Sequence, residues 1–162
     1  MEIVIRGPLA KYIAARAKEE GVDVEEFLAR LVAEELDEDA RVGLYLELHQ
    51  ERLSEAEELE REGDIVQAGE KLWGAVCSLL SAIAELRGWR HFSHRDYCDI
   101  VERLVAELSE PELSKEFASA ERLHANYYHA FLRPESFKAH RDAVLKLMER
   151  LRGLLAGRTS AA

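Results

Sequence analysis

The segment between Gly63 and Gly88 constrains the fold most, because it is one unbroken helical pattern with apolar side chains on two faces. Asp64 and Gln67 form a capping box at its start, and Gly88 is a typical helix end. A helix that is apolar on more than one face lies at the centre of a bundle. The two stripes are Ile65, Ala68, Leu72, Val76, Leu79, Ile83 and Leu86, and beside them Trp73, Cys77, Leu80 and Ala84.

Caps and apolar spacing predict further helices on both sides of this segment. Two of them cover 44–62 and about 94–108. A third begins at a Ser109–Glu112 capping box and reaches Leu132, and the last covers 135 to about 155. Only 3 prolines and 9 glycines occur in 162 residues, which agrees with a helical chain. We therefore predict an all-α fold with a helical bundle over 41–156 and a disordered tail at 157–162.

The first 40 residues, called the arm below, have a different pattern. Glu2–Arg6 is a β-branched run that predicts a short strand, and two helices that are separated by Gly21 follow within the first 36 residues. This order resembles the ribbon-helix-helix fold, in which two chains pair their N-terminal strands. The resemblance implies a homodimer through residues 1–36. A strand that packs on its own domain is the alternative.

Charge argues against an operator-binding role for the arm. Residues 1–40 hold 5 basic and 11 acidic side chains, and the whole chain has a net charge of −10. In DNA-binding ribbon-helix-helix proteins the outward strand residues, here Glu2, Val4 and Arg6, read the major groove. An acidic surface at that place repels phosphates, so we expect no binding of duplex DNA.

The remaining composition indicates a cytoplasmic protein without a bound cofactor. Cys77 and Cys98 are too few for a disulfide scaffold, so we interpret them as buried thiols in a reducing compartment. The apolar run 75–84 is about half the length of a membrane span, and no secretory signal precedes it. His91 and His94 have ligand-like spacing, but they flank a predicted helix start, and we expect no metal site there.

Two clusters carry possible chemistry. Arg122, Asn126 and His129 fall on one helix face, where His129 can act as a general base and Arg122 can hold a phosphate, as in a metal-independent ribonuclease. The alternative is a solvated face, or side chains that satisfy helix ends. The second cluster consists of His94, Arg95, His124 and Tyr128. These side chains could bind an anionic ligand near a helix N-terminus, or they could form a structural hydrogen-bond network.

The runs EREGDIVQAGEKLWGAVCSLLSAIAELRGW, SHRDY and LHANYYHAFL resemble the archaeal paralogous-repeat (PaREP) family, a branch similar to the HEPN superfamily of nucleotide-binding domains. The resemblance covers 44–155. It implies a dimeric bundle with a long antiparallel helix pair, and an antitoxin or nucleotidyltransferase-type partner. Many HEPN proteins are ribonucleases with four to six residues between an Arg and a His. Arg122 and His129 have six residues between them, although Leu123 replaces the usual polar residue.

Three functions remain open on the sequence. The first, which we prefer, is a HEPN-like homodimer that binds a nucleotide, an RNA end or a protein near His94, Arg95, His124 and Asn126. The second is a metal-independent ribonuclease that uses Arg122 and His129. The third is a non-catalytic scaffold in which all of these residues only pack and cap.

Overall fold

The computed structural model describes residues 1–159, and this range contains seven α-helices and no β-strand. The all-α class is therefore confirmed. None of these helices combines the length and the apolar character that a membrane span requires. The helices are α1 (Gly7–Glu20), α2 (Val24–Ala33), α3 (Glu38–Glu62), α4 (Ile65–Arg87), α5 (His94–Leu108), α6 (Glu112–His129) and α7 (Pro134–Thr159).

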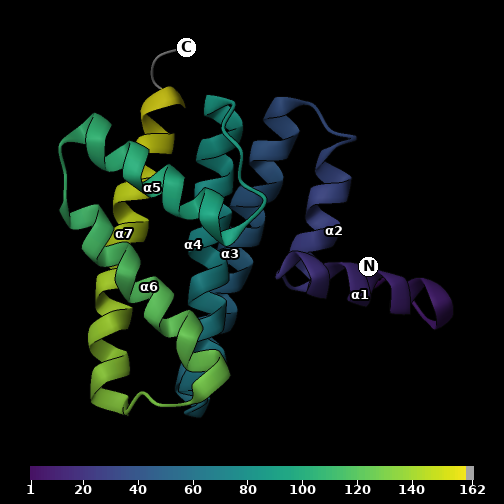
Figure 1. Cartoon of the computed structure of the whole chain (residues 1–162), viewed down its shortest axis with the longest axis horizontal. Coiled ribbons are helices and arrows are strands. Elements are labelled where there is room, and N and C mark those ends of the chain that lie inside the picture. Colours follow the sequence, from purple (N-terminus) through teal and green to yellow (C-terminus); the bar gives the residue numbers. More distant parts are fainter. Residues whose placement is uncertain (160–162) are drawn as a thin grey trace.

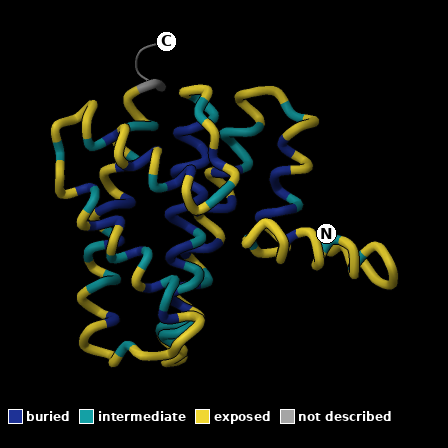
Figure 2. The backbone as a smooth tube through the Cα atoms, in the orientation of Figure 1, coloured by how far each residue is buried: buried dark blue, intermediate teal, exposed yellow. Residues whose placement is uncertain are grey.

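Helix α4 lies at the centre of the bundle, as its two apolar stripes predict. It pairs with α3 through a tight turn at Gly63, which has a φ of 84°, and it also contacts α5, α6 and α7 (Figure 1). Figure 2 shows the buried backbone concentrated along α4 and its neighbours. Both stripes are buried, as Leu79 of the first and Leu80 of the second show. Burial of such side chains is the main driving force for assembly of the bundle.

The prediction of a strand at Glu2–Arg6 is wrong for the single chain. Residues 1–6 precede α1 without regular structure, because no other segment of residues 1–159 lies beside them to complete a hydrogen-bonded ladder. Ile3 and Val4 are exposed. Helix α1 packs only on α2 and projects from the body of the molecule (Figure 1). The helix–glycine–helix part of the prediction is confirmed, with Gly21 ending α1 at a φ of 69°.

Four boundaries differ from those predicted. The expected Ser109–Glu112 capping box is wrong, because Ser109 ends α5 at a φ of 56° and α6 begins at Glu112 after Pro111. Helix α3 starts at Glu38 instead of residue 44, because Asp37 accepts a hydrogen bond from the Ala40 backbone N–H and acidic residues suit the positive end of a helix. Helix α6 ends at His129 instead of Leu132, where Ala130 turns left-handed at a φ of 46°. Helix α7 continues to Thr159, so 157–159 are helical, while the rest of the expected tail, 160–162, lies outside the described residues.

A buried ion network attaches α2 to the bundle. Arg52 of α3 is 3% exposed and crosses α4 at Gly74, where a Cβ would lie only 3.1 Å from the Arg52 Cδ. Its guanidinium lies 3.3 Å from Glu26 Oε2 of α2. Glu26 Oε1 accepts further hydrogen bonds from Arg30 Nε at 3.2 Å and from the Tyr97 hydroxyl at 3.3 Å. This network holds α2 against α3.

Electrostatics keeps every donor of this network protonated. Burial opposes the charge of Arg52, but the carboxylates of Glu26, Asp23 and Glu25 raise its pKa above the ordinary value. Burial, together with the charge of Glu26, raises the pKa of the Tyr97 hydroxyl. Glu26 therefore meets permanent donors, and α2 stays docked against α3.

Candidate functional site

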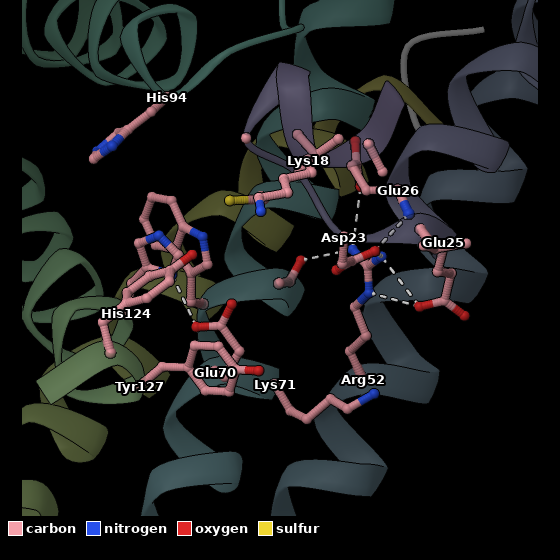
Figure 3. Close-up of a pocket in the computed structure, with 18 of the residues that line it drawn as sticks. Lys18, Asp23, Glu25, Glu26, Arg52, Glu70, Lys71, His94, His124 and Tyr127 are labelled. Atoms are coloured by element: carbon pink, nitrogen blue, oxygen red, sulfur yellow. Dashed lines mark hydrogen bonds and ion pairs between the residues drawn. The ribbon is translucent and has the colours of Figure 1, made fainter. Parts of the chain in front are cut away.

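A cleft of about 750 Å³ lies between the arm and the bundle. One wall consists of the end of α1, the α1–α2 turn and the start of α2. The other wall consists of Arg52 of α3, of α4, of the first turn of α5 and of the last turns of α6 (Figure 3). Because the network around Glu26 fixes α2 at a distance from α6, this space remains open. Its volume lies within the roughly 300–1,000 Å³ range of small-molecule sites.

The bundle wall is aromatic. Trp73 of α4 stacks on the His124 ring with the centroids 4.8 Å apart and the planes at 21°. Tyr128 places its ring edge-on against His124 at 5.2 Å, since residues four apart share one face of α6. The side of this cluster that faces the cleft is accessible, and Tyr128 is 64% exposed.

The arm wall is acidic. Asp23 and Glu25 of the α2 start lie over Arg52, at 3.8 and 3.2 Å (Figure 3). Together with Glu26 they surround one guanidinium, so this wall has an excess of negative charge. Lys18 also lines the cleft, and within residues 1–159 it forms no ion pair. Lys71 on the opposite wall pairs with Glu55 at 2.5 Å.

Two histidine–carboxylate pairs stand at the α5–α6 end of the cleft. His124 Nδ1 lies 2.8 Å from Glu70 Oε2, and His94 Nε2 lies 2.8 Å from Glu121 Oε1. The two imidazole centroids are 6.3 Å apart. A carboxylate that accepts one ring N–H leaves the second ring nitrogen as an acceptor for a proton or a ligand. Each histidine is thus oriented for binding chemistry.

The comparison with known proteins gives a family. Residues 44–148, about two thirds of the chain, match the model of the archaeal PaREP1/PaREP8 family. The chain belongs to this family. No curated protein and no solved structure matches the chain. The matched range of this PaREP1/PaREP8 protein includes the aromatic wall and both histidine–carboxylate pairs, whereas Lys18, Asp23 and Glu25 precede it.

The cleft of this PaREP1/PaREP8 protein brings together three of the four predicted ligand-binding residues. His94, His124 and Tyr128 all line it, although they come from two different helices. Arg95 does not, since its side chain is largely exposed and pairs with Asp99 at 3.1 Å on the outer face of α5.

The predicted catalytic stripe lies elsewhere. Arg122 and His129 are exposed on α6 and neither lines the cleft; the Arg122 guanidinium covers the Phe131 ring at 4.8 Å. Asn126 is fully buried, and its Oδ1 accepts the Leu132 backbone N–H at 2.7 Å. Asn126 thus closes the turn after α6, which agrees with the structural alternative for this residue.

We expect Asn126→Ala to lower the free energy of unfolding by about 1–3 kcal/mol, because the Leu132 N–H loses its acceptor. Urea denaturation measures this change. His129→Ala, three residues further along the same helix and exposed, should stay within about 0.5 kcal/mol of the wild type. Equal stabilities of the two variants would contradict the structural role of Asn126.

Sequence reasoning missed several residues of the cleft. Glu70 and Trp73 are three apart on α4, and this spacing could have indicated a shared face. The apolar stripe predicted that Trp73 belongs to the core. It is buried there, and it also lines the cleft. No local signal identifies Lys18, Asp23 or Arg52, because they reach the cleft only through the docking of the arm.

Proposed function

We propose that this protein is a binding module for a nucleotide or the unpaired end of an RNA, with the cleft as its binding site. The observation that carries the proposal is the aromatic wall of Trp73, His124 and Tyr128, which is open to a cleft of about 750 Å³. Tyr127 and Tyr128 are both exposed at this wall, so their rings are accessible to a ligand.

Stacking supports a planar heterocyclic ligand. Unpaired bases bind proteins by stacking on Tyr, Trp and His side chains, and each stacked base contributes about 1–3 kcal/mol. Tyr128 provides an accessible face, and Tyr127, which is 40% exposed, stands next to it at 5.2 Å. The Trp73–His124 stack beneath holds these rings in place.

The charges of the cleft support a base and a short phosphate rather than a long polyanion. Exocyclic amino groups and ring N–H groups of a base are donors, and Asp23 and Glu25 on the arm wall are acceptors. Glu25 uses Oε2 for Arg52, and its Oε1 has no partner within residues 1–159. Lys18 is the unpaired cation at the rim, suited to one phosphate.

The architecture supports a HEPN-like classification. Helices α3 and α4 form a long antiparallel pair, and α6 and α7 pack against α4 (Figure 1). This arrangement is the one that the resemblance of the sequence to the HEPN superfamily implies. We therefore propose a HEPN-like fold for the bundle.

Calorimetry with AMP, GMP and a short single-stranded RNA tests the binding proposal. We expect Tyr128→Ala to weaken binding by 10-fold or more, because one stacked base is lost. Tyr12→Ala is the matched control, since Tyr12 is exposed on α1 outside the cleft. Absence of binding by the wild type, or equal affinities of the two variants, would contradict the proposal.

The same samples also address the ribonuclease hypothesis. Its support is that Arg122 and His129 are exposed on one helix and that Arg122 forms no ion pair within residues 1–159. RNA cleavage in EDTA that Arg122→Ala and His129→Ala both lose would replace the binding module with an enzyme.

A second copy of the chain is the partner that we propose for the arm. Ile3, Val4 and Ile5 are exposed, and so is Leu9 of α1. Antiparallel pairing of two such segments would satisfy their backbone groups and cover this apolar surface. We expect sedimentation to give twice the mass of the chain, and Val4→Pro to give a monomer because proline removes a ladder donor. Val4→Thr is the control, and a monomeric wild type would contradict the proposal.

A further inference from the structure

Three side chains with metal-binding atoms meet beside the cleft. His94 and Cys98 come from α5, and Glu121 comes from α6. Their ligand atoms all lie within 4.8 Å of one another. Glu121 Oε1 is 2.8 Å from His94 Nε2 and 3.7 Å from Cys98 Sγ. These contacts place a nitrogen, a sulfur and an oxygen donor around one point.

We propose that His94, Cys98 and Glu121 bind a Zn²⁺ ion. Zinc takes a tetrahedral set of Cys, His and carboxylate ligands at about 2.0–2.3 Å, which places the ligand atoms roughly 3.3–3.8 Å apart. The three donors are already close to this spacing, so small side-chain rotations suffice. The thiolate disfavours Mg²⁺ and Ca²⁺, which prefer oxygen ligands only.

The backbone already presents the ligands. His94 and Cys98 are four residues apart and therefore share one face of α5, and this face packs against α6, which carries Glu121. The Trp73 ring contacts the His94 ring edge-on at 5.3 Å and restricts its orientation. Cys98 is partly buried against the hydrophobic core, which limits the positions of its sulfur.

The site adjoins the cleft and leaves one coordination position for another donor. Three protein ligands plus a water or ligand atom is the pattern of exchangeable zinc sites, whereas structural sites use four protein ligands. His94 belongs to both the site and the cleft lining. His124 stands nearby, with its centroid 6.3 Å from that of His94 and its Nδ1 held by Glu70. A molecule in the cleft could thus supply the fourth ligand.

This inference needs no nucleotide, and its test is separate from that of the proposed function. The full-length protein is reduced, freed of metal with EDTA, desalted and titrated with ZnCl₂ by calorimetry. We expect one Zn²⁺ per chain, and at least a 10-fold weaker affinity in His94→Ala and in Cys98→Ser. His129→Ala is the matched control, because His129 is an exposed histidine outside the cluster.

Thiol reactivity gives a second readout that does not depend on affinity. Cys77 is buried and Cys98 is partly exposed, so a chromogenic disulfide reagent should modify one thiol of the metal-free protein. One equivalent of Zn²⁺ should abolish this reaction, and the same amount of Mg²⁺ should not. Circular dichroism confirms that each variant is folded. No zinc uptake by the wild type, or uptake that His94→Ala and Cys98→Ser leave unchanged, would overturn the inference.

Discussion

Replacement of Arg52 by Met is expected to lower the free energy of unfolding by about 3–5 kcal/mol, the usual cost of removing one partner from a buried ion pair. Arg52 is 3% exposed and its guanidinium contacts Glu25, Glu26, the Gly74 carbonyl and the Ser78 hydroxyl. Met fills much of the same space but donates no hydrogen bond. The loss is therefore mainly electrostatic.

Glu26 is the residue that loses its main ion-pair partner in this variant. Its side chain is buried, and without Arg52 it keeps only the Arg30 Nε at 3.2 Å and the Tyr97 hydroxyl at 3.3 Å. Its Oε2 then has no donor within residues 1–159. A buried carboxylate with an unpaired oxygen favours the undocked arm, in which water solvates it. The cleft loses its arm wall at the same time.

Urea denaturation of three variants separates this cause from simple loss of charge. Arg16→Met, on the exposed surface of α1, should stay within about 0.5 kcal/mol of the wild type. The double variant Arg52→Met, Glu26→Gln should recover part of the lost stability, because no unpaired carboxylate remains buried and the amide oxygen still accepts the hydrogen bonds of Arg30 and Tyr97. A loss below about 1 kcal/mol in Arg52→Met would contradict this account of how the arm docks.

Trp73→Ala is expected to cost a similar amount, about 3–5 kcal/mol, because it leaves a cavity in the core. The Trp73 ring contacts four other rings, those of His94, Tyr97, Phe117 and His124. It therefore belongs to the core and to the cleft wall together. Its removal also deprives His124 of its stacking partner, so ligand affinity should fall with stability.

Thermal and urea denaturation measure the stability of this variant. Trp89→Ala is the matched control, since Trp89 is a half-buried loop residue between the Arg87 and Arg103 guanidinium groups, and its loss should cost about 1–2 kcal/mol. Trp73→Phe should keep most of the stability because it retains an aromatic ring. Equal destabilisation by Trp73→Ala and Trp89→Ala would show that Trp73 has no special place in the packing.

The sequence predicted some features of the cleft and not others. His94, His124 and Tyr128 stood out as polar or aromatic residues near helix ends, and all three line it. Asn126 stood out because it shares a helix face with Arg122 and His129, yet it is buried and closes a turn. Helical periodicity shows which residues share a face, but it does not show whether that face meets solvent, a turn or another helix.

The proposed metal site could not be predicted from the sequence for a related reason. His94 and Cys98 share a face of α5, but their third partner, Glu121, is 27 residues away from His94 in the chain. The carboxylate of Glu70 is 54 residues away from His124. Only the packing of α4, α5 and α6 brings these groups within hydrogen-bond distance.

The helices and the central place of α4 follow from the sequence by itself, because caps and apolar stripes act within one or two turns. Asp23, Asp64 and Ser93 accept hydrogen bonds from backbone N–H groups three residues on, where the sequence places capping boxes. Only the tertiary structure decided how the arm sits and where the cleft opens. The contact between Glu26 and Arg52 spans 26 residues, and its energy depends on burial, which no local pattern encodes.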